Sequence, residues 1–386
     1  MIMEFIEKRA KELYISNSGL SKPADQFGFG FPFLAYSVIF HHYYIPDELT
    51  TLVNSTDKDR KACSIKRGDV FLTRTSETTE ELGMSCVALK DYPNATFNGF
   101  AKRLRPITDE IVPEYAAYYF RSNYIRAQCM SMASLITRAS LNDGMIERLK
   151  IRFPKKKPDQ IKIGSILMNY DKQIEINNKR IKVLEQMAEN LYKEWFVRFR
   201  FPGHETAEFE NGLPKGWSIK KVKEIVKRLP FGTLYKTEDT ESEGKVIVID
   251  QSQDEYVGFH NNEPSHVASP EAPIALFGDH SCKYQLMITP FSLSENVVPY
   301  IGINGVLTGY LYYLTHGIVE TTEYKRHWTE FSAKKVLVAP LRLQEEFVKQ
   351  IIPINEAIQK RKEANRDLIK QRDLLLPRLM SGKLEV

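Results

Sequence analysis

The chain has 386 residues and a mass of 44.6 kDa, which is too long for one ordinary domain and predicts two or three compact units. Hydrophobic residues make up 42% and charged residues 27% of the sequence, a balance typical of globular rather than disordered chains. Lysine and arginine together exceed aspartate and glutamate by 54 − 49 = 5. This mild excess permits nucleic-acid binding without requiring it.

The sequence is not typical of a membrane-spanning protein or of a disulfide-stabilised secreted protein. The longest apolar runs, such as KVIVID at residues 245–250, are far shorter than the roughly 18 residues of a membrane-spanning helix. The N-terminal segment is too charged for a signal peptide, so we expect a cytoplasmic protein. The cysteines lie far apart without a CxxC pair, which argues against a disulfide framework or a cysteine zinc site; they are Cys63, Cys86, Cys129 and Cys282.

An internal repeat is the main organising feature. Residues 158–196 align with residues 341–380 at a constant shift of 344 − 160 = 184. A constant register over this length predicts two copies of one structural unit. The matched pairs are Gln160 and Gln344, Asp171 and Asn355, Ile174 and Ile358, Leu184 and Leu368, and Leu191 and Leu375.

Both copies predict a long helix. Asp171 and Asn355 stand where a side-chain oxygen would cap the first turn, so the first helix is expected over residues 171–196. Apolar residues then follow a heptad pattern that is typical of a coiled-coil seam, with Asn177 and Asn365 as polar members that would fix register. Two unrelated amphipathic helices are the alternative. The predicted packing residues are Ile174, Ile181, Leu184, Leu191 and Trp195 in the first helix, and Ile358, Asn365, Leu368, Leu375 and Leu379 in the second.

The segments before the helices repeat more loosely. Residues 118–122 resemble 312–316, residues 150–154 resemble 336–340, and residues 69–75 resemble 273–279. Short β-branched and aromatic runs between turn residues predict strands and loops. We therefore predict an α/β (mixed α+β) fold in which each of two domains is followed by a long helix, with residues 189–205 as the joint between halves. The predicted regions are 1–155, 156–201, 202–340 and 341–386.

Catalytic and cofactor motifs are missing from the sequence. It contains neither a GxxxxGK[ST] phosphate loop nor an HExxH zinc motif. The FGFGF stretch at residues 27–31 is interpreted as a loop. Asp239, Glu243 and Lys245 suggest a metal-dependent nuclease only weakly, because a nuclease needs acidic ligands from separate strands. We predict a chain without an active site; a nuclease and a coiled-coil adapter remain the alternatives.

Four stretches resemble the specificity (S) subunit of type I restriction-modification systems. They are LYKEWFVRFRFPGHE (191–205), GLPKGW (212–217), LLLPRLMSGKLE (374–385) and KRGDVFLTRTSET (66–78). The resemblance implies two target-recognition domains that each read part of a bipartite DNA sequence, with the two helices packed as an antiparallel coiled coil of pseudo-two-fold symmetry. It also implies a non-catalytic subunit.

The resemblance implies partners as well. Two methyltransferase (M) subunits and the restriction (R) subunits would bind this subunit, and S-adenosylmethionine, ATP and Mg²⁺ would belong to those partners alone. A helix of about 26 residues is roughly 39 Å long at 1.5 Å per residue, close to the ~34–36 Å of one DNA turn. We therefore expect helix length to set the gap between half-sites.

Base-reading candidates follow from donor and acceptor chemistry, in which arginine suits guanine, amides suit adenine and lysines suit phosphates. Two segments of each domain carry such side chains. In the first domain they are Arg74, Thr75, Ser76 and Glu77, and Thr137, Arg138, Ser140 and Asn142; in the second they are Asp279, His280 and Lys283, and Thr322, Tyr324, Lys325, Arg326 and His327.

One departure concerns the start of the first domain. GLPKGWSIKKVKEI (212–225) introduces the second domain, and no counterpart is evident ahead of FPFLAYSVIF (31–40). We therefore expect the first recognition domain to lack an opening strand.

Overall fold

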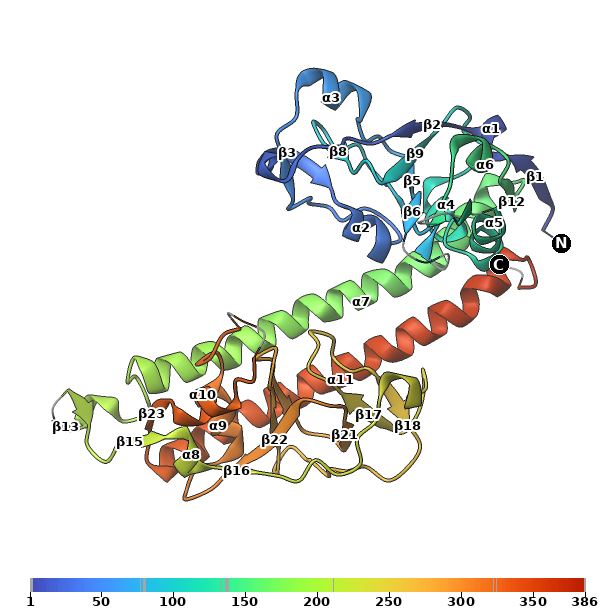
Figure 1. Cartoon of the computed structure of the whole chain (residues 1–386). Helices are drawn as coiled ribbons and strands as arrows, with labels where there is room; N and C mark the ends of the chain where they lie inside the picture. The colour runs from blue at the N-terminus through green and yellow to red at the C-terminus, as the bar shows by residue number, and fades with distance from the viewer. Residues whose placement is uncertain are drawn as a thin grey trace. The chain divides into compact units, whose positions relative to one another are not determined.

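The computed structural model describes residues 3–76, 78, 81–132, 134–135, 139–210, 212–321, 323 and 325–384. The chain forms two compact units (Figure 1). The first unit comprises Met1–Glu175 and Asn365–Val386, and the second comprises Ile176–Ala364. Each long helix therefore contributes a segment to both units, whereas the predicted regions keep each helix whole; those domain boundaries remain predictions.

The first unit begins with an opening strand, so the prediction that it lacks one is wrong. Strand β1 (Phe5–Arg9) leads through helix α1 (Ala10–Leu13) into β2 (Tyr14–Ser18), and β1 pairs antiparallel with β12 (Lys150–Pro154). The carboxylate of Glu12 accepts the backbone N–H of Arg9 at 2.7 Å. This strand was missed because its sequence, FIEKR, is largely polar and half-exposed.

The second unit begins in the same way. Strand β15 (Ser218–Lys221) leads through α8 (Val222–Ile225) into β16 (Val226–Arg228), and β15 pairs antiparallel with β23 (Lys335–Val338). Glu224 accepts the backbone N–H of Lys221 at 2.9 Å. Glu12 and Glu224 therefore close the first turn of a short helix at matching places.

Each unit contains a four-stranded antiparallel sheet of one topology. In the first unit the order is β2, β9 (Ala101–Pro106), β5 (Val70–Thr73) and β7 (Ser85–Val87); in the second it is β16, β22 (Val297–Gly302), β19 (Ile274–Gly278) and β20 (Tyr284–Met287). The central strands β5 and β19 are buried along their whole length. Their apolar sequences, VFLT and IALFG, suit strands covered on both faces.

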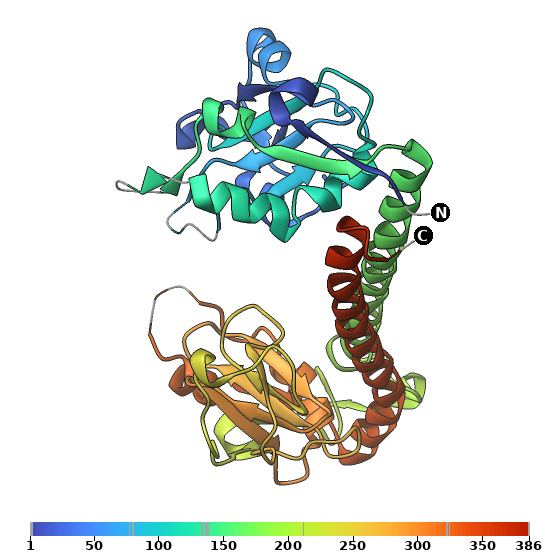
Figure 2. The same ribbon diagram turned by 90° about the vertical axis from the view of Figure 1, so that its right-hand side faces the viewer.

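A three-stranded sheet accompanies the larger one in both units. Its order is β4 (Leu52–Val53), β3 (Phe27–Leu34) and β8 (Thr96–Phe97) in the first unit, and β18 (Gly258–His260), β17 (Val246–Ile249) and β21 (Phe291–Leu293) in the second. In each case one outer strand is antiparallel and the other parallel to the middle strand. Figure 2 shows both sandwich-like domains from one side.

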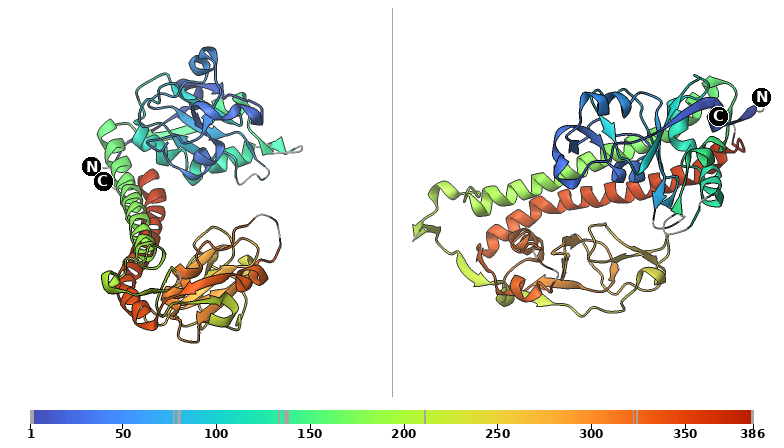
Figure 3. Two further views of the ribbon diagram at one scale, coloured as in Figure 1. Left: turned by 90° about the vertical axis from the view of Figure 1, so that its left-hand side faces the viewer. Right: turned by 45° about the horizontal axis from the view of Figure 1, so that its top comes forward.

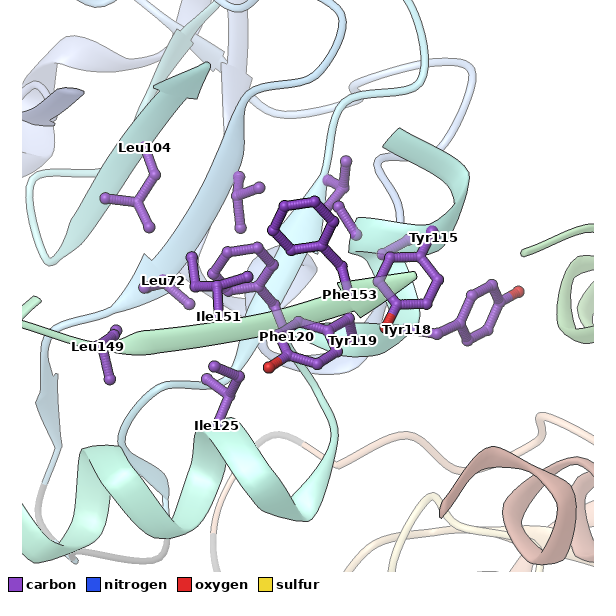
Figure 4. Close-up of a cluster of buried hydrophobic side chains, with 14 of the residues drawn as sticks. Leu72, Leu104, Tyr115, Tyr118, Tyr119, Phe120, Ile125, Leu149, Ile151 and Phe153 are labelled. Carbon is purple, nitrogen blue, oxygen red and sulfur yellow. The ribbon is translucent and has the colours of Figure 1, made fainter. Parts of the chain in front are cut away.

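The first unit has α2 (Tyr36–His41), α3 (Asp57–Ala62), α4 (Pro113–Tyr119), α5 (Asn123–Met132) and α6 (Asp143–Glu147), and the second has α9 (Thr308–Thr315) and α10 (Trp328–Ala333). Helices α2 and α4 of the first unit and α9 of the second lie against the larger sheets. Figure 4 shows how Tyr115 and Tyr119 of α4 lie against Ile151 and Phe153 of β12. Burial of these aromatic rings, each worth a few kcal/mol, fixes α4 on the sheet.

The long helices begin earlier than predicted. Helix α7 spans Lys157–Tyr192 and continues as a π-helical turn over Lys193–Val197, and α11 spans Leu341–Met380. Asp171 and Asn355 are therefore interior residues, and their predicted role as N-caps is wrong. Their side-chain oxygens instead accept hydrogen bonds from the hydroxyls of Tyr118 and Tyr313. At 36 residues, α7 is about 54 Å long, so the predicted length of ~39 Å is also wrong.

Segments of the two long helices lie side by side within each unit (Figure 3). In the first unit Asp171 of α7 forms an ion pair with Arg372 of α11, and in the second unit the ring of Trp195 lies 6.1 Å from that of Phe347. The contact of Asp171 is with Arg372, whereas Trp195, which lies later on α7, contacts Phe347, which lies earlier on α11. The helix segments therefore run antiparallel. The residues of the predicted stripe are buried or half-buried: Ile174, Ile181, Leu184, Leu191, Trp195, Ile358, Asn365, Leu368, Leu375 and Leu379.

Candidate nucleic-acid interface

The two candidate segments of the first unit meet in a small sheet. Strand β6 (Thr75–Ser76) pairs antiparallel with β11 (Ala139–Ser140), which also pairs with β10 (Ser134–Leu135). Ser140 lies opposite Thr75 in this ladder. Just beyond it, the backbone N–H of Leu141 donates to the carbonyl oxygen of Arg74 at 2.8 Å. Segments about 65 residues apart in the sequence thus form one continuous edge.

Some of these side chains already have partners. The hydroxyl of Ser76 donates to the carboxylate of Glu81, and the amide oxygen of Asn142 caps α6 by accepting the N–H of Met145 at 2.9 Å. Arg74 is half-buried, and its Nε is buried without a hydrogen-bond partner. An unpaired buried donor is costly, so an acceptor for Arg74 would stabilise this part of the sheet. Glu77, Thr137 and Arg138 lie outside the described residues.

The two candidate segments of the second unit also meet. Asp279 follows β19, and its carbonyl oxygen accepts the N–H of His327 at 2.8 Å. Nδ1 of His280 lies 3.1 Å from the carbonyl oxygen of Lys325. Lys325 and Arg326 are exposed at this edge, the side chain of Arg326 to 76%. Thr322 and Tyr324 lie outside the described residues.

Two predicted base contacts of the second unit are structural residues instead. His327 has no exposed surface, and its Nε2 lies 3.2 Å from the carbonyl oxygen of Glu323. Asp279 is also buried and accepts the backbone N–H of Trp328 at 2.9 Å. His327 therefore cannot contact a base in this conformation. Lys283 is half-buried and directs its Nζ to the carbonyl oxygen of Asp250 at 3.3 Å.

One exposed residue beside Arg74, Phe100, was missed by sequence reasoning, and an ion pair of the buried Lys102 lies next to it. The carbonyl oxygen of Phe100 accepts the N–H of Arg74, and the ring of Phe100 is largely exposed. Lys102, on the next strand, is buried and pairs with Asp143 at 2.7 Å. The hydrogen bond from Lys102 lowers the pKa of Asp143 below its usual value, although burial opposes this shift. The sequence signal was the run FNGFAKR (97–103), in which two phenylalanines precede two adjacent cations.

Acidic and cysteine side chains are the candidates for metal or thiol chemistry in this chain. Among the described residues, no three His, Cys, Asp or Glu side chains gather in a way that could hold a metal ion. Asp239 ends a short 3-10 turn (Thr237–Asp239) and accepts the N–H of Lys236. All four cysteines are buried and free, and burial raises the pKa of Cys129 to about 12. In the described part of the chain, every helix is too short or too polar to cross a bilayer.

Comparisons with known proteins agree on one family. Residues 6–186 match the family model described as the type I restriction modification DNA specificity domain. The MjaIX specificity subunit of Methanocaldococcus jannaschii, a type I restriction enzyme component, is 24% identical over 363 residues, covering 86% of this chain and 82% of the relative. The HindI specificity subunit of Haemophilus influenzae is 24% identical over 165 residues, covering 42% of this chain and 34% of the relative.

A solved structure has the same fold. The type I restriction-modification S subunit from M. genitalium superposes with a TM-score of 0.58 at 12% identity, over 98% of this chain and 96% of that one. The match extends over both domains and both long helices. In its repeated domain-and-helix layout, in the family model that residues 6–186 match and in its relatives, the chain is similar to type I restriction-modification specificity subunits.

Proposed function

We propose that this chain reads a bipartite DNA target, one part with each unit. The observation that carries the proposal is the pairing of the two candidate segments in each unit, Arg74–Ser76 with Ser140 in the first and His280 with Lys325 in the second. The same two places in the repeat therefore carry donors, which are half-buried at Arg74 and Ser140 in the first unit and exposed at Lys325 and Arg326 in the second. Donors of this kind suit base edges and phosphates.

The partners follow from the family. We propose that two methyltransferase subunits and the restriction subunits assemble on this chain in the cytoplasm, and that they hold S-adenosylmethionine, ATP and Mg²⁺. The present chain would contribute recognition and scaffolding. The long helices α7 and α11 support this role, because each of them contributes a segment to both units.

The test is to map methylated adenine across a methylation-free genome. The host expresses this chain with its neighbouring methyltransferase, and a matched host expresses the methyltransferase alone. A split motif that appears only with both proteins is the expected result. Well-expressed proteins that leave no new mark would overturn the recognition role.

A matched pair of variants assigns the half-sites. We expect Arg74→Ala to relax one half of the motif and Arg326→Ala to relax the other, because each side chain lies in a different unit. Arg342→Ala, on the exposed face of α11, is the control and should leave the motif intact. Metal-dependent cleavage by the purified chain that disappears with Asp239→Asn would instead favour the nuclease alternative.

A further inference from the structure

A buried guanidinium distinguishes the first unit. Arg372 of α11 forms an ion pair with Asp171 of α7 at 2.5 Å, and the two side chains are 13% and 12% exposed. The guanidinium carbon also lies 4.8 Å from the ring centre of Tyr43. The hydroxyl of Tyr118 donates to the other oxygen of Asp171. The carboxylate of Asp171 and the ring of Tyr43 thus hold the guanidinium of Arg372 in place.

The repeat locates the equivalent position in the second unit. The shift of 184 relates Asp171 to Asn355 and Ala188 to Arg372, since 171 + 184 = 355 and 188 + 184 = 372. The hydroxyl of Tyr313 donates to Asn355 at 3.2 Å, as that of Tyr118 does to Asp171. The second unit therefore keeps the tyrosine and the acceptor but has a methyl group where the first unit has a guanidinium.

A cavity of about 410 Å³ lies at this place in the second unit. Glu185 and Glu189, which flank Ala188 on α7, line one wall, and Asp254 and Glu255 line another. Lys283 and Lys362 also line it, so its charged groups are four carboxylates and two lysines. We call this cavity, bounded by these six residues, the α7 pocket.

One buried acceptor of the pocket lacks a hydrogen-bond donor. The buried Oε1 of Gln285, which also lines it, has no hydrogen-bond partner. Lys283 donates to the carbonyl oxygens of Asp250 and Asp254, and Lys193 reaches Glu189 at 3.4 Å from the exposed flank. The rings of Tyr312 and Tyr313 add apolar faces. A flat cation with donors only, such as a guanidinium, satisfies these groups better than an anion or a neutral group does.

We propose that the α7 pocket receives an arginine side chain from a partner protein. The occupant class follows from the first unit, where the chain's own Arg372 fills the equivalent position, and from the excess of carboxylates around Ala188. The inference goes beyond DNA reading and stands without it, because Glu185, Glu189 and Asn355 lie outside the candidate DNA segments, which share only Lys283 with the pocket.

The direct test is titration of the full chain with N-acetyl-arginine amide, followed by nuclear magnetic resonance. The citrulline analogue, which has the same shape without the charge, and the lysine analogue are the comparison probes. We expect the arginine probe to bind at least ten times more tightly than citrulline, with shifts at Tyr313 and Asn355. Equal binding of arginine and citrulline would overturn the proposal.

Variants of surface carboxylates test the binding of the arginine probe without changing the core of the protein. Glu185→Gln/Glu189→Gln should weaken the arginine probe about tenfold, whereas Glu263→Gln/Glu295→Gln, exposed elsewhere in the same unit, should leave it unchanged. Asn355→Asp, which restores the carboxylate of the first unit, should strengthen binding several-fold. Unchanged affinity in the Glu185→Gln/Glu189→Gln variant would contradict the assignment.

A second test uses a variant whose own side chain would occupy the α7 pocket. Ala188→Arg places a guanidinium where the repeat predicts one and should abolish probe binding while circular dichroism stays native. Continued binding to the folded variant would show that the probe sits elsewhere. The chain could instead associate with itself in a concentration-dependent way, and the Glu185→Gln/Glu189→Gln variant could abolish this association. That result would show that the arginine comes from a second copy of this chain and would overturn the assignment to a different protein.

Discussion

The two units share the side chains that satisfy their own backbone and differ in a buried ion pair and in the candidate DNA edge. Gln160 and Gln344 are buried at equivalent places, and each amide accepts one backbone N–H and donates to two backbone carbonyls. By contrast, the first unit has Arg372 and the β6–β11 pairing where the second has Ala188 and the exposed Lys325 and Arg326. Duplication thus retains what the fold needs and leaves the contact surfaces free to diverge.

The largest expected effect tests the shared glutamines. Gln160→Leu leaves the N–H of Val112 and the carbonyl oxygens of Glu110 and Pro154 without partners, so we expect a loss of about 3 kcal/mol in the free energy of unfolding. Gln344→Leu should cost a similar amount in the second unit. Urea titration with hydrogen exchange measures both. The exposed Gln371→Leu is the control, and a much smaller loss at one site would show that the two units differ here after all.

The next effect tests the ion pair that only the first unit has. Arg372→Ala leaves Asp171 half-buried without its cation and should lower the free energy of unfolding by about 2–3 kcal/mol. Asn355→Ala removes only a neutral hydrogen bond from Tyr313 and should cost about 1 kcal/mol. Differential unfolding of the two variants measures this gap. Equal costs would mean that the charge of the first unit adds no stability.

A smaller effect concerns DNA. Loss of one bidentate arginine contact weakens binding to the preferred sequence by about 1–3 kcal/mol, so we expect Arg74→Ala and Arg326→Ala each to do this for one half-site. Competition binding with duplexes altered in a single half-site, in the presence of the methyltransferase, measures the change. Uniform weakening across all duplexes would instead assign the side chain to phosphate contact.

The smallest effect tests the opening helices. Glu12→Gln and Glu224→Gln should each lower the free energy of unfolding by about 0.5 kcal/mol, because a charged acceptor for the backbone N–H of Arg9 or Lys221 becomes neutral. Thermal unfolding at fixed pH measures the pair. A larger loss for Glu12 alone would break the equivalence of the two opening segments.

The constant shift of 184 predicted much of the fold. It placed the helical stripe and matched Gln160 with Gln344 before any contact was known. It could not place the helix starts, because Asp171 and Asn355 look like caps in sequence and only tertiary contacts with Tyr118 and Tyr313 explain them inside a helix. The sequence indicated which segments carry candidate side chains. It could not indicate which of those residues are buried, since the burial of His327 depends on its contact with Asp279, a distant part of the chain.

The division of the chain has a consequence for synthesis on the ribosome. The second unit is continuous from Ile176 to Ala364, whereas the first needs Asn365–Val386 to complete its core, in which Leu376, Leu379 and Met380 are buried. Translation delivers residues in order, at about 5–20 per second. The first unit is therefore completed after the second. Until residues 365–386 are synthesised, part of the apolar core surface of the first unit remains exposed to solvent.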